Sequence, residues 1–563
     1  MARSALSCWR NGATVAVVLG LGLALWPQLG AYGPNWDEAL GPLFYGERYA
    51  AFYLEGDTSA LQFERPHGAD RGPGHPDLAQ GPRFKPWAIW ALPNFLSSLG
   101  CRIFHRGLGL EWLVAHHATN LLLFLAFVLA AAWITASFLP RSRLLLATLL
   151  CVLSPHFHTH LLVNTKDLPM ALGSTLLLLA WYRWRLSFRR FDLLLCALIF
   201  GLALSIKVFA LFQLVAIGCF EAAALALSWF NLGRPEFGRV RRVGTALLIV
   251  AGIGVLVACA SWPYLWDDTF ERLRQHWVYL RVESMRGGLV PDFSRRAWQF
   301  EALASFFCAT PSWWLGLAVL GGVAAWRRRS TLAALLALGL FFELYKNCLP
   351  GVARYDGIRH FLAAVPLSAF FAAEGVAAVA AALRTHRVPV ALPAAFLALA
   401  PLHQLGPYYP WTYCYYNGLC GGLGGVRSSF DPDAGDYWAL SYREGLAAVA
   451  RRFPQGALLT VPIAEHLAAL LGPEQPGLRL VPTVTPQRIS LEPEEVRALV
   501  ELGERQALVA LFIERPGFDN DFTRLLKHSY VPLEVMERDG QPIRWLFLVH
   551  SSKLRDGSRG IVR

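Results

Sequence analysis

Charged residues are scarce in this sequence. Only 16% of its 563 residues are Asp, Glu, Lys or Arg, whereas 55% are hydrophobic, and the mean hydropathy is positive at +0.37. A soluble domain carries about 25% charged residues, which cover its surface. Many stretches also approach the roughly 20 apolar residues that cross a bilayer. The composition therefore excludes a soluble globular protein and predicts an integral membrane protein.

A basic module for nucleic acid is also missing, although the formal net charge is +12. The arginines stand instead in short breaks between apolar runs: Arg141 and Arg143; Arg183, Arg185, Arg189 and Arg190; Arg234, Arg239, Arg241 and Arg242; Arg327 to Arg329; Arg384 and Arg387. Cytoplasmic loops of membrane proteins are enriched in this way. The basic excess thus indicates topology, and we expect no nucleic-acid partner.

Cysteines with zinc-type spacing are absent. Most of the ten cysteines lie in apolar runs, where we expect small core residues; examples are Cys151, Cys196, Cys219, Cys259 and Cys308. Cys414 and Cys420 lie in an aromatic segment expected outside the membrane, as free thiols or as a disulfide. The sequence has neither an internal repeat nor a low-complexity tract.

Eleven apolar segments are predicted to span the membrane: 13–29, 112–138, 144–163, 168–182, 191–206, 208–230, 243–263, 303–325, 331–348, 361–383 and 388–404. Only Lys207 interrupts 191–230, so we predict a tight turn there near the outer face, because a lysine at mid-bilayer is costly. Arg3 and Arg10 indicate a cytoplasmic N-terminus, and the C-terminus is then extracytoplasmic. A cleaved signal peptide is the alternative for the first span, but residues 28–32 form a poor cleavage site.

We predict three regions. A transmembrane region covers 1–405, with a first outer loop at 30–111 that contains an interfacial helix within 86–99 and a second long outer loop at 264–302. An aromatic interfacial connector follows at 406–440. Residues 441–563 then alternate short apolar strands with helical patterns, including a hairpin at Asp539-Gly540, and are predicted to form a small extracytoplasmic α/β domain.

Asp37 and Glu38 follow the first span directly, beside Asn35 and Trp36. Two acids after a span commonly do no more than solvate the loop. At the membrane boundary, however, a carboxylate can take a proton from an acceptor hydroxyl while a lipid phosphate leaves. We therefore predict a catalytic pair, with His75 and Lys85 of the same loop as further polar groups.

A second polar group follows the third span. His156, His158 and His160 suggest a metal, but only His156 and His160 share a helical face, so no more than a two-ligand site is local. A divalent metal is therefore not indicated, and no cofactor is predicted. In Asn164-Thr165-Lys166-Asp167 we expect Asp167 to cap the next helix and Lys166 to meet an anion, with Asn164 beside them.

A third group, Arg354-Tyr355-Asp356-Gly357-Ile358-Arg359-His360, is expected on the outer side. Arginines are unexpected there, and phosphate binding would explain them because guanidinium groups bind phosphate oxygens bidentately. An ion pair with Asp356 or another loop acid is the alternative. Arg354, Tyr355, Arg359 and His360 are the candidates, and Lys207 is expected to join the same anion site.

Several of these motifs together resemble the GT-C superfamily of membrane glycosyltransferases, and most closely the bacterial relatives of family 39, the protein O-mannosyltransferase type that uses dolichyl-phosphate-mannose-like donors. The matching segments cover residues 13 to about 450: Trp36-Asp37-Glu38, Asn164 to Pro169, Trp262 to Trp266, Tyr355 to Phe361, Asp436-Tyr437-Trp438 and Ser441 to Glu444.

The resemblance implies a GT-C fold and transfer of a sugar from a polyprenyl-phosphate donor to an acceptor at the outer face of a bacterial inner membrane. It implies that Asp37 is the catalytic base, that Glu38 positions donor or acceptor, and that the outer basic residues hold the lipid phosphate. The luminal sugar-binding repeats of eukaryotic relatives are missing, which puts a protein acceptor in doubt. A transporter or flippase and a non-catalytic envelope assembly factor are the alternatives. Sugar, acceptor, polyprenol length and oligomeric state are not encoded in these motifs.

Overall fold

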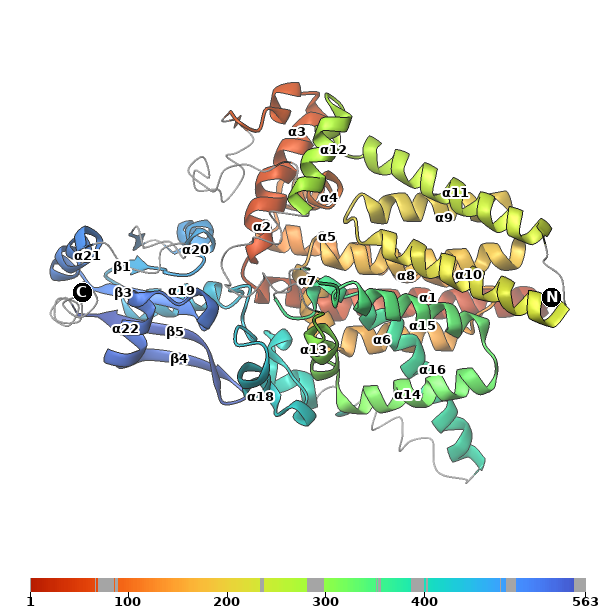
Figure 1. Cartoon of the computed structure of the whole chain (residues 1–563). Helices are drawn as coiled ribbons and strands as arrows, with labels where there is room; N and C mark the ends of the chain where they lie inside the picture. The colour runs from red at the N-terminus through yellow and green to blue at the C-terminus, as the bar shows by residue number, and fades with distance from the viewer. Residues whose placement is uncertain are drawn as a thin grey trace.

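The computed structural model describes the chain except residues 1, 66, 69–85, 87–89, 233–236, 281–297, 351, 353–355, 386–398, 401–402, 476, 482–492 and 551–563. It consists of a helical bundle and, at the end away from the N-terminus, a small mixed sheet flanked by helices (Figure 1).

The helices that run along the bundle alternate in direction from one to the next (Figure 1). They are α1 (Ala2–Leu25), α5 (Trp112–Ile134), α6 (Arg141–Leu153), α8 (Asp167–Ser187), α9 (Arg190–Leu204), α10 (Ala210–Leu232), α11 (Phe237–Ala260), α14 (Ser312–Arg327), α15 (Thr331–Tyr345) and α16 (Ala364–Thr385).

Five described helices are long and apolar enough to cross a membrane, or seven spans result when two bent helix pairs each count as one. The predicted number of eleven is thus not confirmed. Much of predicted span 388–404 lies outside the described residues. Helices α8, α9 and α15 share the direction of the bundle but do not meet the same test of length and apolarity.

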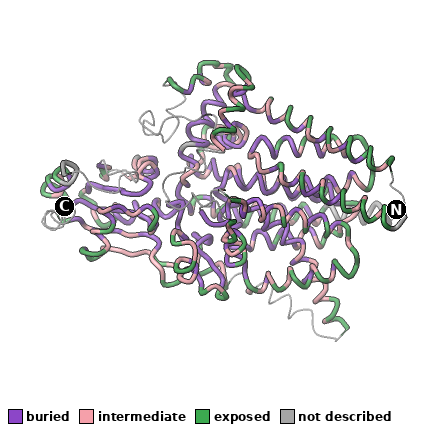
Figure 2. The backbone as a smooth tube through the Cα atoms, in the orientation of Figure 1, coloured by how far each residue is buried: buried purple, intermediate pink, exposed green. Residues whose placement is uncertain are grey.

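Apolar side chains on the outside of the bundle agree with a membrane-embedded protein. Leu227, Phe230, Leu248 and Leu256 of α10 and α11 are 63–86% exposed. Exposed residues line the outer helices in Figure 2, whereas buried residues fill the end of the bundle that meets the sheet. Contiguous exposed apolar surface of this kind marks contact with lipid. The protein is an integral membrane protein.

Two predicted spans are broken. Residues 144–163 form α6 and α7 (Pro155–Val163), which meet at 85°, and 303–325 form α13 (Glu301–Ala309) and α14, which meet at 106°. A proline stands at or just before the first residue of the second helix in each pair, at Pro155 and Pro311, where its missing N–H costs no helical hydrogen bond. The breaks keep α7 and α13 at the end of the bundle that meets the sheet.

Shorter helices cover that end of the bundle. They include α2 (Trp36–Leu40), the π-helix η2 (Gly41–Gly46), α3 (Glu47–Glu55), α4 (Ala91–Cys101) and α12 (Thr269–Val278). Helices α3, α4 and α12 lie steeply across the direction of the bundle (Figure 1). The helix expected within 86–99 is thus present as α4, and Lys207 lies in the turn between α9 and α10, as predicted.

The C-terminal sheet has five strands in the order β2-β1-β3-β5-β4. The strands are β1 (Ala457–Thr460), β2 (Leu478–Leu480), β3 (Leu508–Ile513), β4 (Pro532–Arg538) and β5 (Gln541–Val549). Strand β1 pairs in parallel with β2 and β3, whereas β5 pairs antiparallel with β3 and β4. All six residues of β3 are buried, because α19 (Tyr442–Arg452), α20 (Glu465–Leu471), α21 (Pro493–Arg505) and α22 (Asp521–Ser529) surround the sheet.

The predicted hairpin is confirmed: Asp539 and Gly540 join β4 to β5 with φ angles of 55° and 66°. Positive φ at both central residues is the conformation that favours Asp-Gly. The core of the sheet region also includes Ala39 and Leu113 from the bundle side, so this region, through α20, packs on α2 and shares its core with the start of α5.

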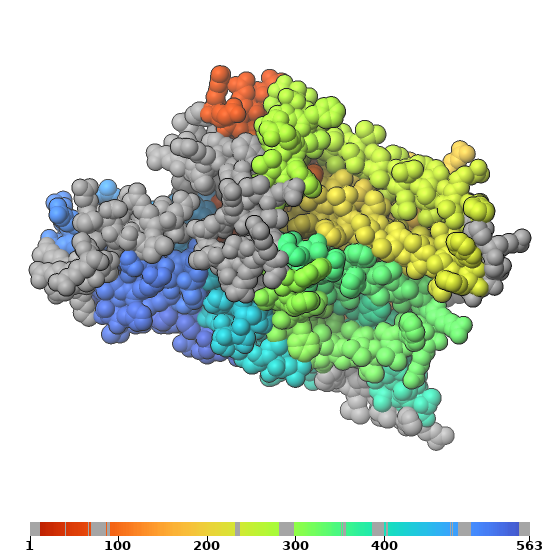
Figure 3. Space-filling view, viewed as in Figure 1, coloured from red at the N-terminus to blue at the C-terminus, as the bar shows by residue number. Residues whose placement is uncertain are grey.

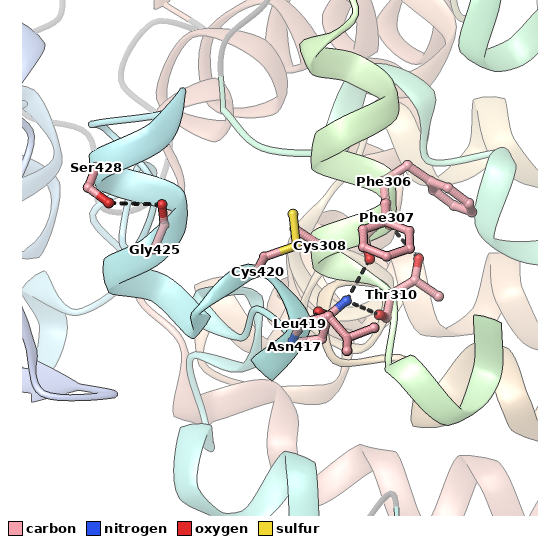
Figure 4. Close-up of a disulfide and its surroundings, with 9 residues drawn as sticks. All are labelled: Phe306, Phe307, Cys308, Thr310, Asn417, Leu419, Cys420, Gly425 and Ser428. Atoms are coloured by element: carbon pink, nitrogen blue, oxygen red, sulfur yellow. Dashed lines mark hydrogen bonds between the residues drawn. A yellow bond between two sulfur atoms is a disulfide. The ribbon is translucent and has the colours of Figure 1, made fainter. Parts of the chain in front are cut away.

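The connector joins both parts. It contains the short helix α18 (Gly422–Ser429) and abuts the blue C-terminal strands on one side and the green helices of the bundle on the other (Figure 3). Cys420 forms a disulfide with Cys308 of α13, and Asn417 donates to the backbone oxygens of Phe307 and Thr310 (Figure 4). Neither of the two states considered for Cys414 and Cys420 holds for both residues: Cys414 is a buried free thiol, whereas Cys420 bonds to Cys308, which was expected to be a small core residue. The broken span at α13 places Cys308 next to Cys420.

Candidate active site

Helix α2 is held by a capping box. The Asn35 side-chain oxygen accepts from the backbone N–H groups of Asp37 and Glu38, at 2.9 and 3.0 Å, and the Glu38 carboxylate accepts from the Asn35 N–H at 2.8 Å. The Asn35 amide also donates to the Val163 carbonyl at 2.5 Å, at the end of α7. Asn35 thereby both caps this five-residue helix and fixes its first turn to the end of α7. Asp37 lies in that first turn.

The two adjacent acids have different environments. Glu38 is buried, and besides closing the capping box it lies 3.2 Å from Nε2 of buried His117, whose Nδ1 contacts the Leu29 carbonyl at 2.9 Å. The Asp37 side chain is 27% exposed. Only Asp37 is therefore placed to meet a substrate directly, while Glu38 holds the helix that carries it.

Two cations face the Asp37 carboxylate. Arg359 donates from Nη1 to its Oδ2 at 2.5 Å, and the Lys166 Nζ lies 3.7 Å from the same oxygen. Burial raises the pKa of Asp37, but the charges of Lys166 and Arg359 outweigh it, so the pKa lies below its ordinary value of 3.8. Asp37 is thus ionised at neutral pH.

Asp167 does not cap α8: it is the first residue of the helix, whose N-cap residue is Lys166, and the side chain of that residue makes no capping hydrogen bond. The Asn164 side-chain oxygen accepts from the backbone N–H groups of Lys166 and Asp167, at 3.1 and 2.8 Å. The Asp167 carboxylate points instead at the Lys207 ammonium, with which it forms a close ion pair, and lies 3.8 Å from Arg359. The expectation that Asp167 caps the helix was wrong, because its carboxylate is engaged by Lys207 and Arg359.

Arg359 lies among three carboxylates. Besides Asp37 and Asp167, it meets Asp356 three residues earlier, with Nη2 2.9 Å from Oδ2. Asp356 and Gly357 both have positive φ, 61° and 62°, and a Cβ on Gly357 would lie 3.0 Å from the Tyr437 ring. The turn brings Asp356 back to the arginine, so the ion pair weighed from the sequence is present.

Asp356 has a second partner from the sheet region. Arg515, which follows β3, donates from Nη2 to Asp356 Oδ1 at 2.7 Å and lies 3.5 Å from Asp433. Ion pairs of at most 3.8 Å thus join four carboxylates (Asp37, Asp167, Asp356, Asp433) to four cations (Lys166, Lys207, Arg359, Arg515). The predicted anion-binding cations lie together but are paired with carboxylates.

The histidines after the third span contact protein groups. His156 meets the Tyr415 carbonyl at 2.7 Å, His158 meets Gln28 at 2.9 Å, and His160 meets the Tyr437 hydroxyl at 3.2 Å. Within the described ranges, no three His, Cys, Asp or Glu side chains are grouped to hold a metal ion. Burial, followed by the charges of Lys207 and Arg359, places the pKa of His360 well below 6.5, so His360 is neutral beside the cluster.

Four predicted site residues, His75, Lys85, Arg354 and Tyr355, lie outside the described residues. The sequence reasoning missed Arg515, Asp433 and His117 as members of the site. Arg515 follows a buried strand about 150 residues after Arg359, and no local pattern separates it from the other arginines of the tail. His117 lies within an apolar helix, and the available signal in the sequence was a titratable residue inside an otherwise apolar run.

No protein-family model and no curated protein matches the sequence. Solved structures resemble the fold over nearly the whole chain. They include ArnT from Cupriavidus metallidurans in the apo state, at 14% identity and a TM-score of 0.49 over 98% of this chain and 99% of that one. The same protein bound to undecaprenyl phosphate gives 14% and 0.46 over 95% and 97%.

The archaeal oligosaccharyltransferase AglB from Archaeoglobus fulgidus, in complex with an inhibitory peptide and a dolichol-phosphate, gives 14% identity and a TM-score of 0.44. This match covers 90% of this chain and 70% of that one. At these identities the likeness is distant, and we base the function on the residues of this chain.

Proposed function

We propose that this protein is a membrane glycosyltransferase that moves a sugar from a polyprenyl-phosphate donor to an acceptor hydroxyl at the outer face of the membrane. The observation that carries the proposal is Asp37: a partly exposed carboxylate, ionised at neutral pH, with an arginine and a lysine at its oxygen. It lies at the end of a membrane-embedded bundle, where the headgroup of a lipid-borne donor would arrive.

The chemistry follows from these groups. The acceptor oxygen attacks the anomeric carbon, and its proton passes to Asp37 as the new glycosidic bond forms. The bond from the anomeric carbon to the phosphate oxygen breaks, and its electron pair leaves with the polyprenyl phosphate. A single in-line displacement inverts the configuration at the anomeric carbon.

Lys166 is the cation best placed for the leaving phosphate. Its side chain is 20% exposed and lies 3.7 Å from Asp37, a longer approach than the 2.5 Å of Arg359. A phosphate oxygen can therefore engage Lys166 while Arg359 keeps Asp37 oriented. Negative charge that grows on the phosphate is then met by an ammonium already in position. Asn164 and Lys207, which both contact Asp167, are further candidates for donor binding, together with His360.

We further propose that the site faces the periplasm of a bacterial inner membrane, with a cytoplasmic N-terminus. The described arginines Arg141, Arg183, Arg190, Arg239, Arg327 and Arg384 stand at helix ends away from the site, as expected for cytoplasmic loops. The Cys308–Cys420 disulfide lies at the outer end, and disulfides persist in oxidising compartments. A 1–405 catalytic region, a 406–440 connector and an outer 441–563 domain fit this arrangement.

The test is transfer of radiolabelled sugar from a panel of polyprenyl-phosphate sugars to a membrane and periplasmic extract, with purified protein in nanodiscs. Asp37→Asn keeps the shape of the side chain and removes the base, and we expect a loss of at least about 100-fold. Asp57→Asn is the matched control, because Asp57 lies in the first outer loop and pairs with His67 rather than with the cluster.

Equal transfer by wild type and Asp37→Asn would remove Asp37 from the mechanism. No transfer from any donor by folded wild-type protein would reject the proposed function and favour transport or envelope assembly. The labelled product of an active protein would identify the acceptor.

A further inference from the structure

Arg515 is buried, which is unusual for an arginine of a small sheet region. It is 4% exposed, and its guanidinium donates to the Tyr437 carbonyl and to Asp356, both at 2.7 Å. Its guanidinium carbon lies 4.1 Å from the centre of the Phe518 ring and 5.4 Å from that of Trp36, the residue before Asp37. The side chain thus ends at the junction between the sheet region and α2.

From Arg515 a line of alternating charges leads to the candidate base. Arg515 donates to Oδ1 of Asp356. The other oxygen of Asp356, Oδ2, pairs with Nη2 of Arg359, and Nη1 of Arg359 donates to Asp37. Arg515, Asp356 and Arg359 are 4–8% exposed, whereas the Asp37 side chain is 27% exposed. Only the last member of the line is open to a substrate.

Asp356 and Asp37 compete for Arg359, so a change at one end of this line of charges affects the other end. Asp356 and Asp37 use the two terminal nitrogens of one guanidinium, and charges interact strongly where water is excluded. Because Arg515 neutralises Asp356, Arg359 need not turn wholly to Asp356. Without Arg515, Asp356 keeps only its ion pair with Arg359 and draws the guanidinium away from Asp37.

We propose that Arg515 is a positioning residue for Asp37, acting through Asp356 and Arg359, so that the C-terminal sheet region completes the active site. Its role rests on the proposed function insofar as Asp37 is the base. The geometry makes the docked sheet region a condition for the orientation of Asp37, and not merely a cover over the site.

The test compares wild type, Arg515→Gln and the double variant Arg515→Gln/Asp356→Asn. In Arg515→Gln, we expect the acidic limb of the kcat/KM profile to move up by about one pH unit, because the guanidinium that favours the Asp37 carboxylate withdraws. In the double variant the competing carboxylate is gone, so the limb returns toward the wild-type position. A purely structural role in docking predicts no such return.

A second measurement does not depend on activity. Carbodiimide-driven amidation of Asp37, quantified by mass spectrometry of its peptide across about pH 3–7, follows the protonation of that carboxyl. The same upward shift and the same return are expected. Arg524→Gln is the control, since Arg524 lies in the same region, is exposed, and pairs with Asp521.

Identical amidation curves for wild type and Arg515→Gln would overturn the proposal, as would a shift that persists in the double variant. Wild-type protein without transferase activity would reject the proposed function, while the amidation curves would still decide whether Arg515 positions Asp37. If Arg515→Gln does not fold, Arg515→Lys is used. It keeps the charge but cannot hold Tyr437 and Asp356 together, so an intermediate shift is expected.

Discussion

Asp37 and Glu38 are neighbours in sequence, yet their surroundings give them separate tasks. Both carboxylate oxygens of Glu38 are engaged, one by the capping box of α2 and the other by His117. Asp37 keeps an exposed edge and two cations. Burial disfavours an ionised carboxylate, whereas adjacent positive charge favours it. For Asp37 the charges win, which makes Arg359 as important to the site as the acid itself.

The pH dependence of transfer follows from this balance. Because the pKa of Asp37 lies below 3.8, the base is ionised at every pH above that value, and kcat/KM governed by Asp37 should stay level from neutral to mildly acidic pH. It should fall only as the pH drops through the lowered pKa. In Arg359→Gln, burial acts with less opposition, and the fall should begin at a higher pH.

A kcat/KM profile of both proteins from about pH 3 to 8, which includes the pH range below 3.8, checks this expectation. Arg524→Gln again serves as the control for loss of an arginine. An acidic limb at the same pH in wild type and Arg359→Gln would show that Arg359 does not set the charge state of the base.

Helix α2 has only five residues, and a helix this short is not stable on its own. Its cap and its packing must hold it. Asn35 serves both needs, because its carbonyl oxygen caps the helix and its amide reaches the Val163 carbonyl. The position of Asp37 therefore depends on a residue that takes no part in the chemistry.

Asn35→Ala should reduce stability by about 1 kcal/mol through the lost cap and should lower kcat more than stability alone explains, because Asp37 moves with the helix. Ser330→Ala is the matched control. Ser330 caps α15 at the opposite end of the bundle, where loss of a cap should leave kcat unchanged. Thermal unfolding and steady-state transfer measure the two effects.

A normal kcat in Asn35→Ala, with stability lowered as in Ser330→Ala, would show that packing alone positions Asp37. Equal losses of kcat in both variants would instead point to a general effect of destabilisation.

The whole molecule is divided by the membrane. One end of the bundle carries the arginine-rich turns, and the other carries the charge cluster, the connector and the sheet. The Cys308–Cys420 bond joins residues 112 positions apart and fixes the connector to α13 (Figure 4). In the chain-entropy account, a crosslink over such a loop stabilises a protein by about 5 kcal/mol.

The disulfide provides a test of both stability and orientation. In protein taken from cells whose free thiols have been alkylated, mass spectrometry should find Cys308 bonded to Cys420. Cys420→Ser should lower the thermal midpoint, whereas Cys219→Ser, which removes an exposed free thiol, should not. Alkylated Cys308 and Cys420 in the wild type would contradict a periplasmic location of this end.

Local patterns of residues were enough to predict the membrane-embedded bundle, the turn at Lys207, the hairpin at Asp539-Gly540 and polar groups that gather at one end of the bundle. Apolar runs, buried charge and turn chemistry are local properties, so they can be recognised from neighbouring residues. The sequence also suggested that Asp37 and Arg359 belong to one site, although each was reached through a separate motif.

Which charges and thiols meet is set by the three-dimensional packing. Asp167 pairs with Lys207 instead of capping α8, and Cys308 rather than Cys414 pairs with Cys420. Arg515 reached the site from far along the chain. Such pairings depend on where broken helices end and how the sheet docks, because a charge or a thiol finds its partner through distance in space and not through spacing in sequence.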